Sequence, residues 1–123
     1  MGYVGWLISD DDRKNLLREI PPQYPDVIAH HVTLEFGVPK DHPLPDPKKG
    51  VVVGVSDDGE GIQAIVVEID GTTDRPDGST YHITWSLDKE AGYKPVHSND
   101  LIKDYRWHEI MPIEIDLIPF YGR

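Results

Sequence analysis

Short β-branched runs separated by turn sequences dominate this chain, and they predict a fold built mainly from strands. Val51–Val55 and Ile62–Ile69 are rich in valine and isoleucine, and the polar, glycine-containing segment Ser56–Gly61 joins them, which is typical of a β-hairpin. Ser9–Ile20 instead predicts a helix, because Ser9 can cap it and acidic residues suit its N-terminal end. The other expected strands are 2–8, 27–36, 80–87 and 107–120. Ser98 is expected to cap a second short helix that runs through Leu101 and Ile102. About six strands and two helices indicate an α+β chain.

Length and composition favour a single intracellular domain. The chain has 123 residues, which is the size of one domain, so we expect residues 1–123 to fold as one unit. It contains no cysteine, which excludes disulfides, a thiolate zinc site and a cysteine nucleophile. No apolar run approaches the ~18 residues of a membrane span, and no basic region precedes the short apolar N-terminal stretch. We expect a soluble, cytoplasmic protein with no membrane partner.

The net charge restricts the class of partner. Twelve Lys and Arg stand against 22 Asp and Glu, which gives a formal charge of −10. Proteins that bind long nucleic acids present a basic face, because neutralising phosphates dominates their affinity. A long duplex is therefore an unfavourable partner. A small anionic ligand is still compatible with this charge, because one cavity needs only a few local donors.

Two of the predicted strands share an unusual pattern of histidine, an apolar residue, threonine and another apolar residue. Side chains in a strand alternate between faces, so the histidine and threonine of each strand share one face and the apolar residues point to the other. The alternative interpretation is two half-exposed strands whose polar faces merely meet water. The two motifs are His31-Val32-Thr33-Leu34 and His82-Ile83-Thr84-Trp85.

This pair of motifs resembles the defining mark of the two-histidine (2H) phosphoesterase superfamily, and the chain resembles a small, phage-type member of it. It departs from the larger members in two respects, because its motifs lie only 51 residues apart and the chain is short, which leaves the substrate class open. The resemblance implies a bilobal α+β fold with a pseudo-two-fold axis, antiparallel sheets and a central cleft beside the motif strands. It also implies hydrolysis or formation of phosphodiester bonds without a metal. The common substrates are 2′,3′-cyclic phosphates of nucleotides or RNA ends, and some phage-encoded members degrade cyclic oligonucleotide signals.

The chemistry of the motif residues suits this reaction. Cleaving a P–O ester bond needs a base to activate the attacking oxygen and an acid to protonate the leaving oxygen. Histidine can do either, because its ordinary pKa lies near neutral pH. We therefore predict that His31 and His82 form the acid–base pair, and that Thr33 and Thr84 donate to the non-bridging phosphate oxygens. The sequence leaves open which histidine is the base.

Other residues are weaker candidates for substrate binding. Glu35 and Ser86 continue the motif faces at period two and are expected to line the cleft, although exposure to solvent is an equally good interpretation. Tyr93 and Lys94 lie in an irregular segment that can fold over the cleft, where a solvated loop or packing is the alternative.

Two residues next to the first motif are expected to point away from the cleft. His30 is expected on the face opposite to His31, and Phe36 is expected in the core.

No other catalytic pattern competes with the paired motifs. The sequence lacks a clustered set of metal ligands, a phosphate-binding P-loop and the Gly-x-Ser-x-Gly elbow of serine hydrolases. We expect no metal and no cofactor. The leading hypothesis is a phosphodiesterase acting on a small nucleotide, a cyclic nucleotide or an RNA end. The alternative is a non-catalytic module that binds or sequesters a nucleotide in the same cleft.

Overall fold

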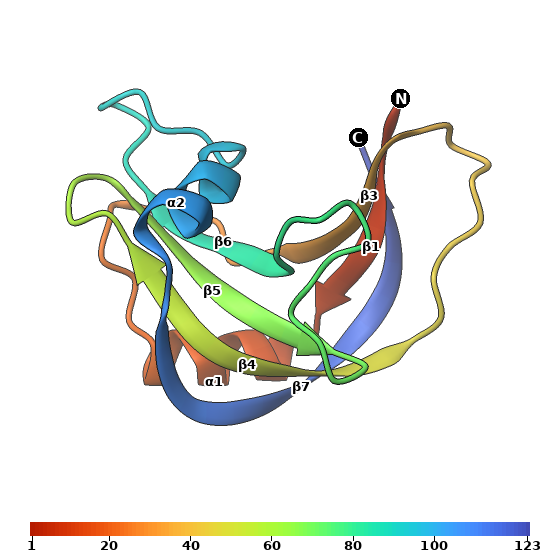
Figure 1. Cartoon of the computed structure of the whole chain (residues 1–123), viewed down its shortest axis with the longest axis horizontal. Coiled ribbons are helices and arrows are strands. Elements are labelled where there is room, and N and C mark those ends of the chain that lie inside the picture. Colours follow the sequence, from red (N-terminus) through yellow and green to blue (C-terminus); the bar gives the residue numbers. More distant parts are fainter.

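One seven-stranded antiparallel sheet forms the body of the protein (Figure 1). The computed structural model describes residues 1–123. The strand order is β2-β6-β5-β4-β7-β1-β3. The elements are β1 (Gly2–Ile8), α1 (Asp10–Glu19), β2 (Asp26–Val27), β3 (His31–Val38), β4 (Lys48–Asp57), β5 (Ile62–Ile69), β6 (His82–Leu87), α2 (His97–Tyr105) and β7 (His108–Gly122).

The α+β class and the hairpin of β4 and β5 are confirmed, but two details of the predicted arrangement are wrong. The chain forms one continuous sheet, because β4 pairs with both β5 and β7, whereas we expected separate sheets. The strand expected over residues 27–36 is divided into β2 and β3, which raises the number of strands to seven.

A bend at Ala29 divides that strand. Ala29 is fully buried and has a left-handed backbone, with φ of 43°, a conformation that costs an L-residue roughly 1–2 kcal/mol. The amides of Ile28 and Ala29 donate to carbonyls of β6 at 2.9 and 3.0 Å, and the side chain of Arg13 donates to the Ala29 carbonyl at 2.9 Å. The residues after the bend leave β6 and pair with β1 as β3. The bend therefore connects the two edges of the sheet and brings β3 close to β6.

The helices cover opposite faces of the sheet. In α1, the Ser9 hydroxyl accepts from the Asp12 amide at 3.2 Å, as predicted, and Leu16 is fully buried in the larger core cluster with Trp6 and Trp85. In α2, Leu101 joins a second cluster formed with residues of β5. Neither helix is long and apolar enough to cross a bilayer.

The predicted start of α2 is wrong. The helix begins at His97, and Ser98 is fully buried within its first turn instead of capping it. The Ser98 hydroxyl lies 2.8 Å from the hydroxyl of Thr84 on β6. This contact fixes the beginning of α2 against one of the two motif strands.

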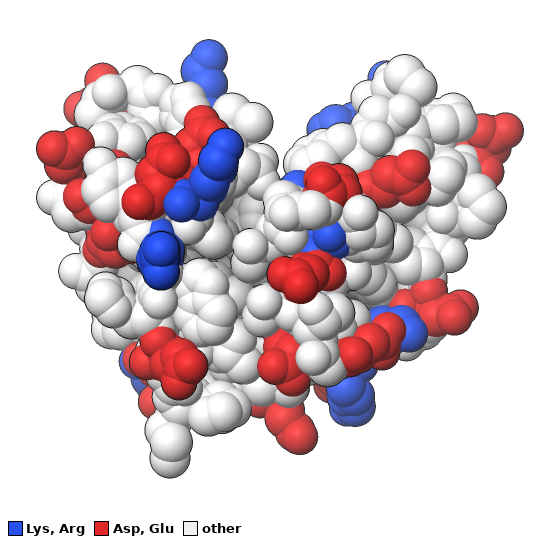
Figure 2. Space-filling model, in the orientation of Figure 1, with Lys and Arg blue, Asp and Glu red and all other residues white.

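The sheet curves strongly, and the molecule has two lobes with a notch between them (Figures 1 and 2). One lobe carries α2, and the other carries the ends of β1 and β3. Close approach of β1 to β3 depends on Gly5, since a Cβ there would lie 2.1 Å from the Val32 carbonyl oxygen and 3.0 Å from the Thr33 Cα. The absence of a side chain at Gly5 therefore allows β3, the first motif strand, to pack closely against β1.

Candidate functional site

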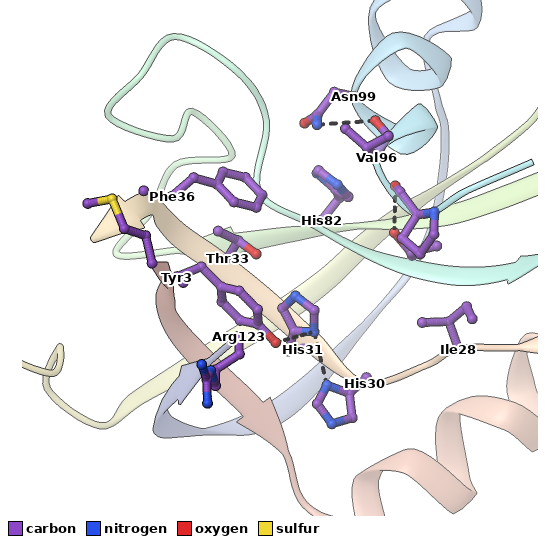
Figure 3. Close-up of a pocket in the computed structure, with 15 residues that line it drawn as sticks. Tyr3, Ile28, His30, His31, Thr33, Phe36, His82, Val96, Asn99 and Arg123 are labelled. Carbon is purple, nitrogen blue, oxygen red and sulfur yellow. Dashed lines mark hydrogen bonds between the residues drawn. The ribbon is translucent and has the colours of Figure 1, made fainter. Parts of the chain in front are cut away.

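The four motif residues line one cavity of about 530 Å³ between α2 and the strands β1 and β3. His31 and Thr33 come from β3, and His82 and Thr84 come from β6 (Figure 3). These strands are far apart in the order of the sheet. The curvature of the sheet and the bend at Ala29 bring them together.

No Asp or Glu side chain is among the 15 residues that line the cavity, although the whole chain contains 22 of them. Arg123 contributes a positive side chain to the wall. The walls of the notch in Figure 2 are accordingly mostly uncharged. An anion bound in this cavity therefore meets no Asp or Glu side chain, although the protein as a whole is strongly acidic.

His82 is held in one tautomer. Its Nδ1 lies 2.8 Å from the carbonyl oxygen of Thr80, and because a carbonyl only accepts, Nδ1 carries the proton. The neutral ring therefore has an unprotonated Nε2. Burial lowers the pKa of His82 below its usual 6.5, and the charge of Arg75 adds to this effect while the Thr80 carbonyl opposes it. His82 is poised to accept a proton at Nε2.

His31 has a different environment. Its ring stacks on Tyr3 with centroids 4.4 Å apart, and its Nδ1 lies 3.0 Å from Nδ1 of His30 and 3.4 Å from the Tyr3 hydroxyl. Burial is the main cause that lowers the pKa of His31 to about 4, and the nearby His30 and His82 lower it further. If Nδ1 of the neutral His31 ring accepts a hydrogen bond from Tyr3 or from His30, the ring proton lies on Nε2. His31 can then present a hydrogen-bond donor to the cavity.

His30 lies on the cavity side, not on the opposite face as the sequence predicts. It precedes β3 and follows the bend at Ala29, so strand alternation does not apply to it. His30 lines the cavity and contacts His31 edge to face, with centroids 5.2 Å apart.

The threonines have different partners. The Thr84 hydroxyl lies 2.8 Å from the Ser98 hydroxyl and 3.3 Å from the Pro95 carbonyl oxygen, so it is anchored to the beginning of α2. Thr33 is buried at the cavity wall, and its backbone carbonyl accepts from Arg75 at 3.4 Å. The Thr84 hydroxyl is therefore held in place before any ligand binds, whereas the Thr33 contact fixes only the backbone of that residue.

A register shift follows the threonine in each motif strand. Thr33 pairs with Gly5 and Glu35 with Val4, so one residue of β3 is extra. On β6, Thr84 pairs with Ala64 and Ser86 with Gln63, which again leaves one residue extra. Such a bulge reverses which face the following side chains occupy. The alternation of side chains that starts at each histidine therefore no longer predicts which residues line the cavity beyond the threonine.

Glu35 and Ser86 consequently lie outside the cavity. Glu35 is exposed and pairs with His42 at 3.3 Å. Ser86 is fully buried, and its hydroxyl donates to the Gln63 side chain at 2.7 Å. The shift on β3 instead turns Phe36, which the sequence places in the core, toward the cavity, where it is 56% exposed.

Tyr93 and Lys94 also lie outside the cavity. The Tyr93 ring packs on Gly61, where a Cβ would lie 2.2 Å from a ring carbon. Lys94 is exposed, and its amide donates to Nδ1 of His97 at 3.0 Å. The irregular segment does reach the cavity, but through Pro95 and Val96.

Arg75 is the site residue that sequence reasoning misses. It is only 4% exposed and lies in the loop before β6. Its guanidinium bonds to Asp77 at 3.1 Å, to the Thr33 carbonyl at 3.4 Å and to Oδ1 of Asn99 at 3.3 Å, and it lies 5.4 Å from the centroid of the Phe36 ring. One buried cation thus connects β3 to α2 behind the cavity.

No family model, no curated protein and no solved structure matches this chain.

The arrangement of residues in the cavity indicates which chemistry the site can support. No group of three or more His, Asp or Glu side chains is placed to hold a metal ion. The cavity presents the imidazoles of His31 and His82, whose Nδ1 atoms have different partners, together with two threonine hydroxyls and apolar walls that include Ile28 and Phe36. Such a site can bind an anion that carries an apolar group and move protons on either side of it.

Proposed function

We propose that this chain is a metal-independent phosphodiesterase that hydrolyses a cyclic phosphate or a short phosphodiester of a nucleotide or RNA end. The observation that carries this proposal is the convergence of both histidines and both threonines of the paired motifs on one cavity whose lining contains no Asp or Glu. The apolar part of the wall suits a nucleoside, and the size of the cavity suits a small ligand.

The hydrogen bonds of the two rings suggest their roles. His82, with Nδ1–H donated to Thr80, takes a proton from water at Nε2, and the water oxygen bonds to phosphorus. His31 gives its Nε2 proton to the departing ribose oxygen as the P–O bond breaks, which leaves a phosphate monoester. His31 has to be protonated before it acts as the acid, and the negative charge of a bound phosphate raises its pKa. The Thr33 hydroxyl stabilises the charge on a non-bridging oxygen, and the Thr84 hydroxyl does the same when its proton turns from the Pro95 carbonyl to the phosphate.

The direct test is hydrolysis of nucleoside 2′,3′-cyclic phosphates and of short oligonucleotides in the presence of EDTA. We expect conversion to phosphate monoesters at a rate that EDTA leaves unchanged. Loss of turnover with EDTA would contradict the metal-independent mechanism. Tight binding without product over long incubation would instead favour the non-catalytic nucleotide-binding module.

The pH dependence provides a second prediction. The value of kcat/KM reports the ionisation of the free enzyme, in which the pKa of His31 is lowered to about 4 and that of His82 also lies below 6.5. A neutral base and a protonated acid coexist best between two such values, so the bell-shaped profile of kcat/KM should have its optimum below pH 6.5. Bound phosphate raises both pKa values, so the profile of kcat should be displaced to higher pH. A rate that only rises with pH would contradict paired acid–base catalysis.

A further inference from the structure

A second cavity, of about 610 Å³, adjoins the first. The two cavities share His82 and Asn99 in their walls, so a phosphate bound at His82 lies at the boundary between them. The second cavity extends along α2 and its wall includes Lys103, Arg106 and Trp107. The proposed hydrolysis of a mononucleotide makes no use of this space.

Trp107 forms an aromatic wall of the second cavity and is held rigidly. Its ring lies against Gly54 of β4, where a Cβ would be 2.1 Å from a ring carbon. Any side chain at position 54 would displace the indole. An aromatic ring that is fixed in this manner can serve as a platform on which a nucleobase stacks.

Arg106 has a strained backbone. Its φ of 60° and ψ of −159° lie in a region that is almost confined to glycine, and such strain concentrates at functional sites. The Ser56 hydroxyl donates to the Arg106 carbonyl, and the Arg106 amide donates to the Ile102 carbonyl at 3.0 Å. Glycine would adopt this backbone without strain, so the presence of arginine points to a use for its side chain.

The charges around this cavity favour one further anion. Lys103 and Arg106 are exposed and form no ion pair. Of the carboxylates in the wall, Asp77 already faces the Arg75 guanidinium at 3.1 Å, which together with the Ser79 hydroxyl holds the pKa of Asp77 far below its usual range. Asp100 is the other carboxylate, and two free cations outnumber it.

We propose that the second cavity binds a second nucleotide of the substrate, with its base on Trp107 and its phosphate between Lys103 and Arg106. The proposal rests on the proposed function, because it takes the reacting phosphate to lie at His82. It identifies the substrate as an RNA end of at least two nucleotides, and it makes a mononucleoside cyclic phosphate a poorer substrate.

The test compares kcat/KM for a dinucleotide that ends in a 2′,3′-cyclic phosphate with kcat/KM for the corresponding mononucleotide. We expect the dinucleotide to be preferred by at least ~10-fold in the unmodified protein, the size of one stacking contact. Arg106→Gly removes the guanidinium and relieves the strained backbone, so it keeps the fold and should lower the preference several-fold. Trp107→Leu should lower it similarly. Lys14→Ala removes a cation from the exposed side of α1 and should leave the preference intact.

The outcomes separate this inference from the proposed function. Turnover of both substrates with equal kcat/KM, or a dinucleotide preference that survives both Arg106→Gly and Trp107→Leu, would overturn the second subsite and leave the phosphodiesterase standing. If neither substrate is hydrolysed, the proposed function fails, and calorimetric binding of the same two compounds replaces turnover. Tighter binding of the dinucleotide that Arg106→Gly reduces would then support the subsite, and equal binding would reject it.

Discussion

Replacing His82 with alanine is expected to lower kcat for cyclic phosphate hydrolysis by roughly 10²–10⁴-fold, the usual contribution of a positioned general base. The same loss is expected for His31→Ala, because one ring serves the attacking oxygen and the other the leaving oxygen of the in-line O–P–O arrangement. The measurement is steady-state hydrolysis at the pH optimum, with circular dichroism to show that the variants fold. His108→Ala is the matched control, since His108 is exposed and lies outside both cavities. Full turnover in either cavity variant would remove that histidine from the mechanism.

A substrate with an activated leaving group separates the two roles. A p-nitrophenyl phosphodiester of a nucleoside releases an anion that needs no proton, so loss of the acid is tolerated and loss of the base is not. We therefore expect His31→Ala to recover most of its activity on this ester, whereas His82→Ala stays impaired. If His82→Ala recovers activity and His31→Ala does not, the roles are exchanged, and His31 is the base and His82 the acid. That result would contradict the roles inferred from the hydrogen bonds of the two rings.

The motif faces are the part of the site that the sequence predicts well. Alternation over three residues places His31 with Thr33 and His82 with Thr84, and both pairs line the same cavity. The prediction fails one residue later, because each strand has a bulge directly after its threonine. A bulge depends on pairing with a partner strand, which for β3 is β1, so the local sequence carries no period that reveals it.

The approach of the two strands is likewise a tertiary property. An alanine at position 29 gives no turn signal comparable to glycine or asparagine, yet its left-handed backbone redirects the chain from β6 to β1. The strain is offset by full burial of Ala29 and by the Arg13 hydrogen bond to its carbonyl. Local propensity therefore predicts one long strand where tertiary contacts impose two.

The contacts of the Arg75 side chain also cannot be predicted from the local sequence. Its surroundings, Asp74-Arg75-Pro76-Asp77-Gly78, predict a turn, and the turn is present, with Gly78 donating to the Arg75 carbonyl at 2.9 Å. Nothing in such a turn indicates that its arginine is buried and reaches Thr33 and Asn99 on other elements. Those contacts exist only once the sheet has curved, so they are visible in the structure alone.

Replacing Arg75 with methionine is expected to lower the free energy of unfolding by about 2 kcal/mol, because the Thr33 carbonyl and Asn99 Oδ1 lose their buried donor. Methionine fills a similar volume, so the effect isolates the lost hydrogen bonds and charge from a cavity. Urea unfolding measures it. Arg75→Lys is the control that keeps the charge but cannot donate to Asp77, Thr33 and Asn99 at once, so it should lose stability as well.

The two variants should differ in one property that a purely structural role would not change. The positive charge of Arg75 helps to hold the pKa of His82 below 6.5, while Asp77 acts in the opposite direction. Arg75→Met removes the charge and leaves the carboxylate, so protonation of His82 becomes easier and its pKa rises, whereas Arg75→Lys should keep it low. Titration of the His82 ring by NMR measures this pKa in both variants. Equal pKa values of His82 in the two variants would limit Arg75 to a structural role. The expected difference would show that its charge, in addition to burial, lowers the proton affinity of His82.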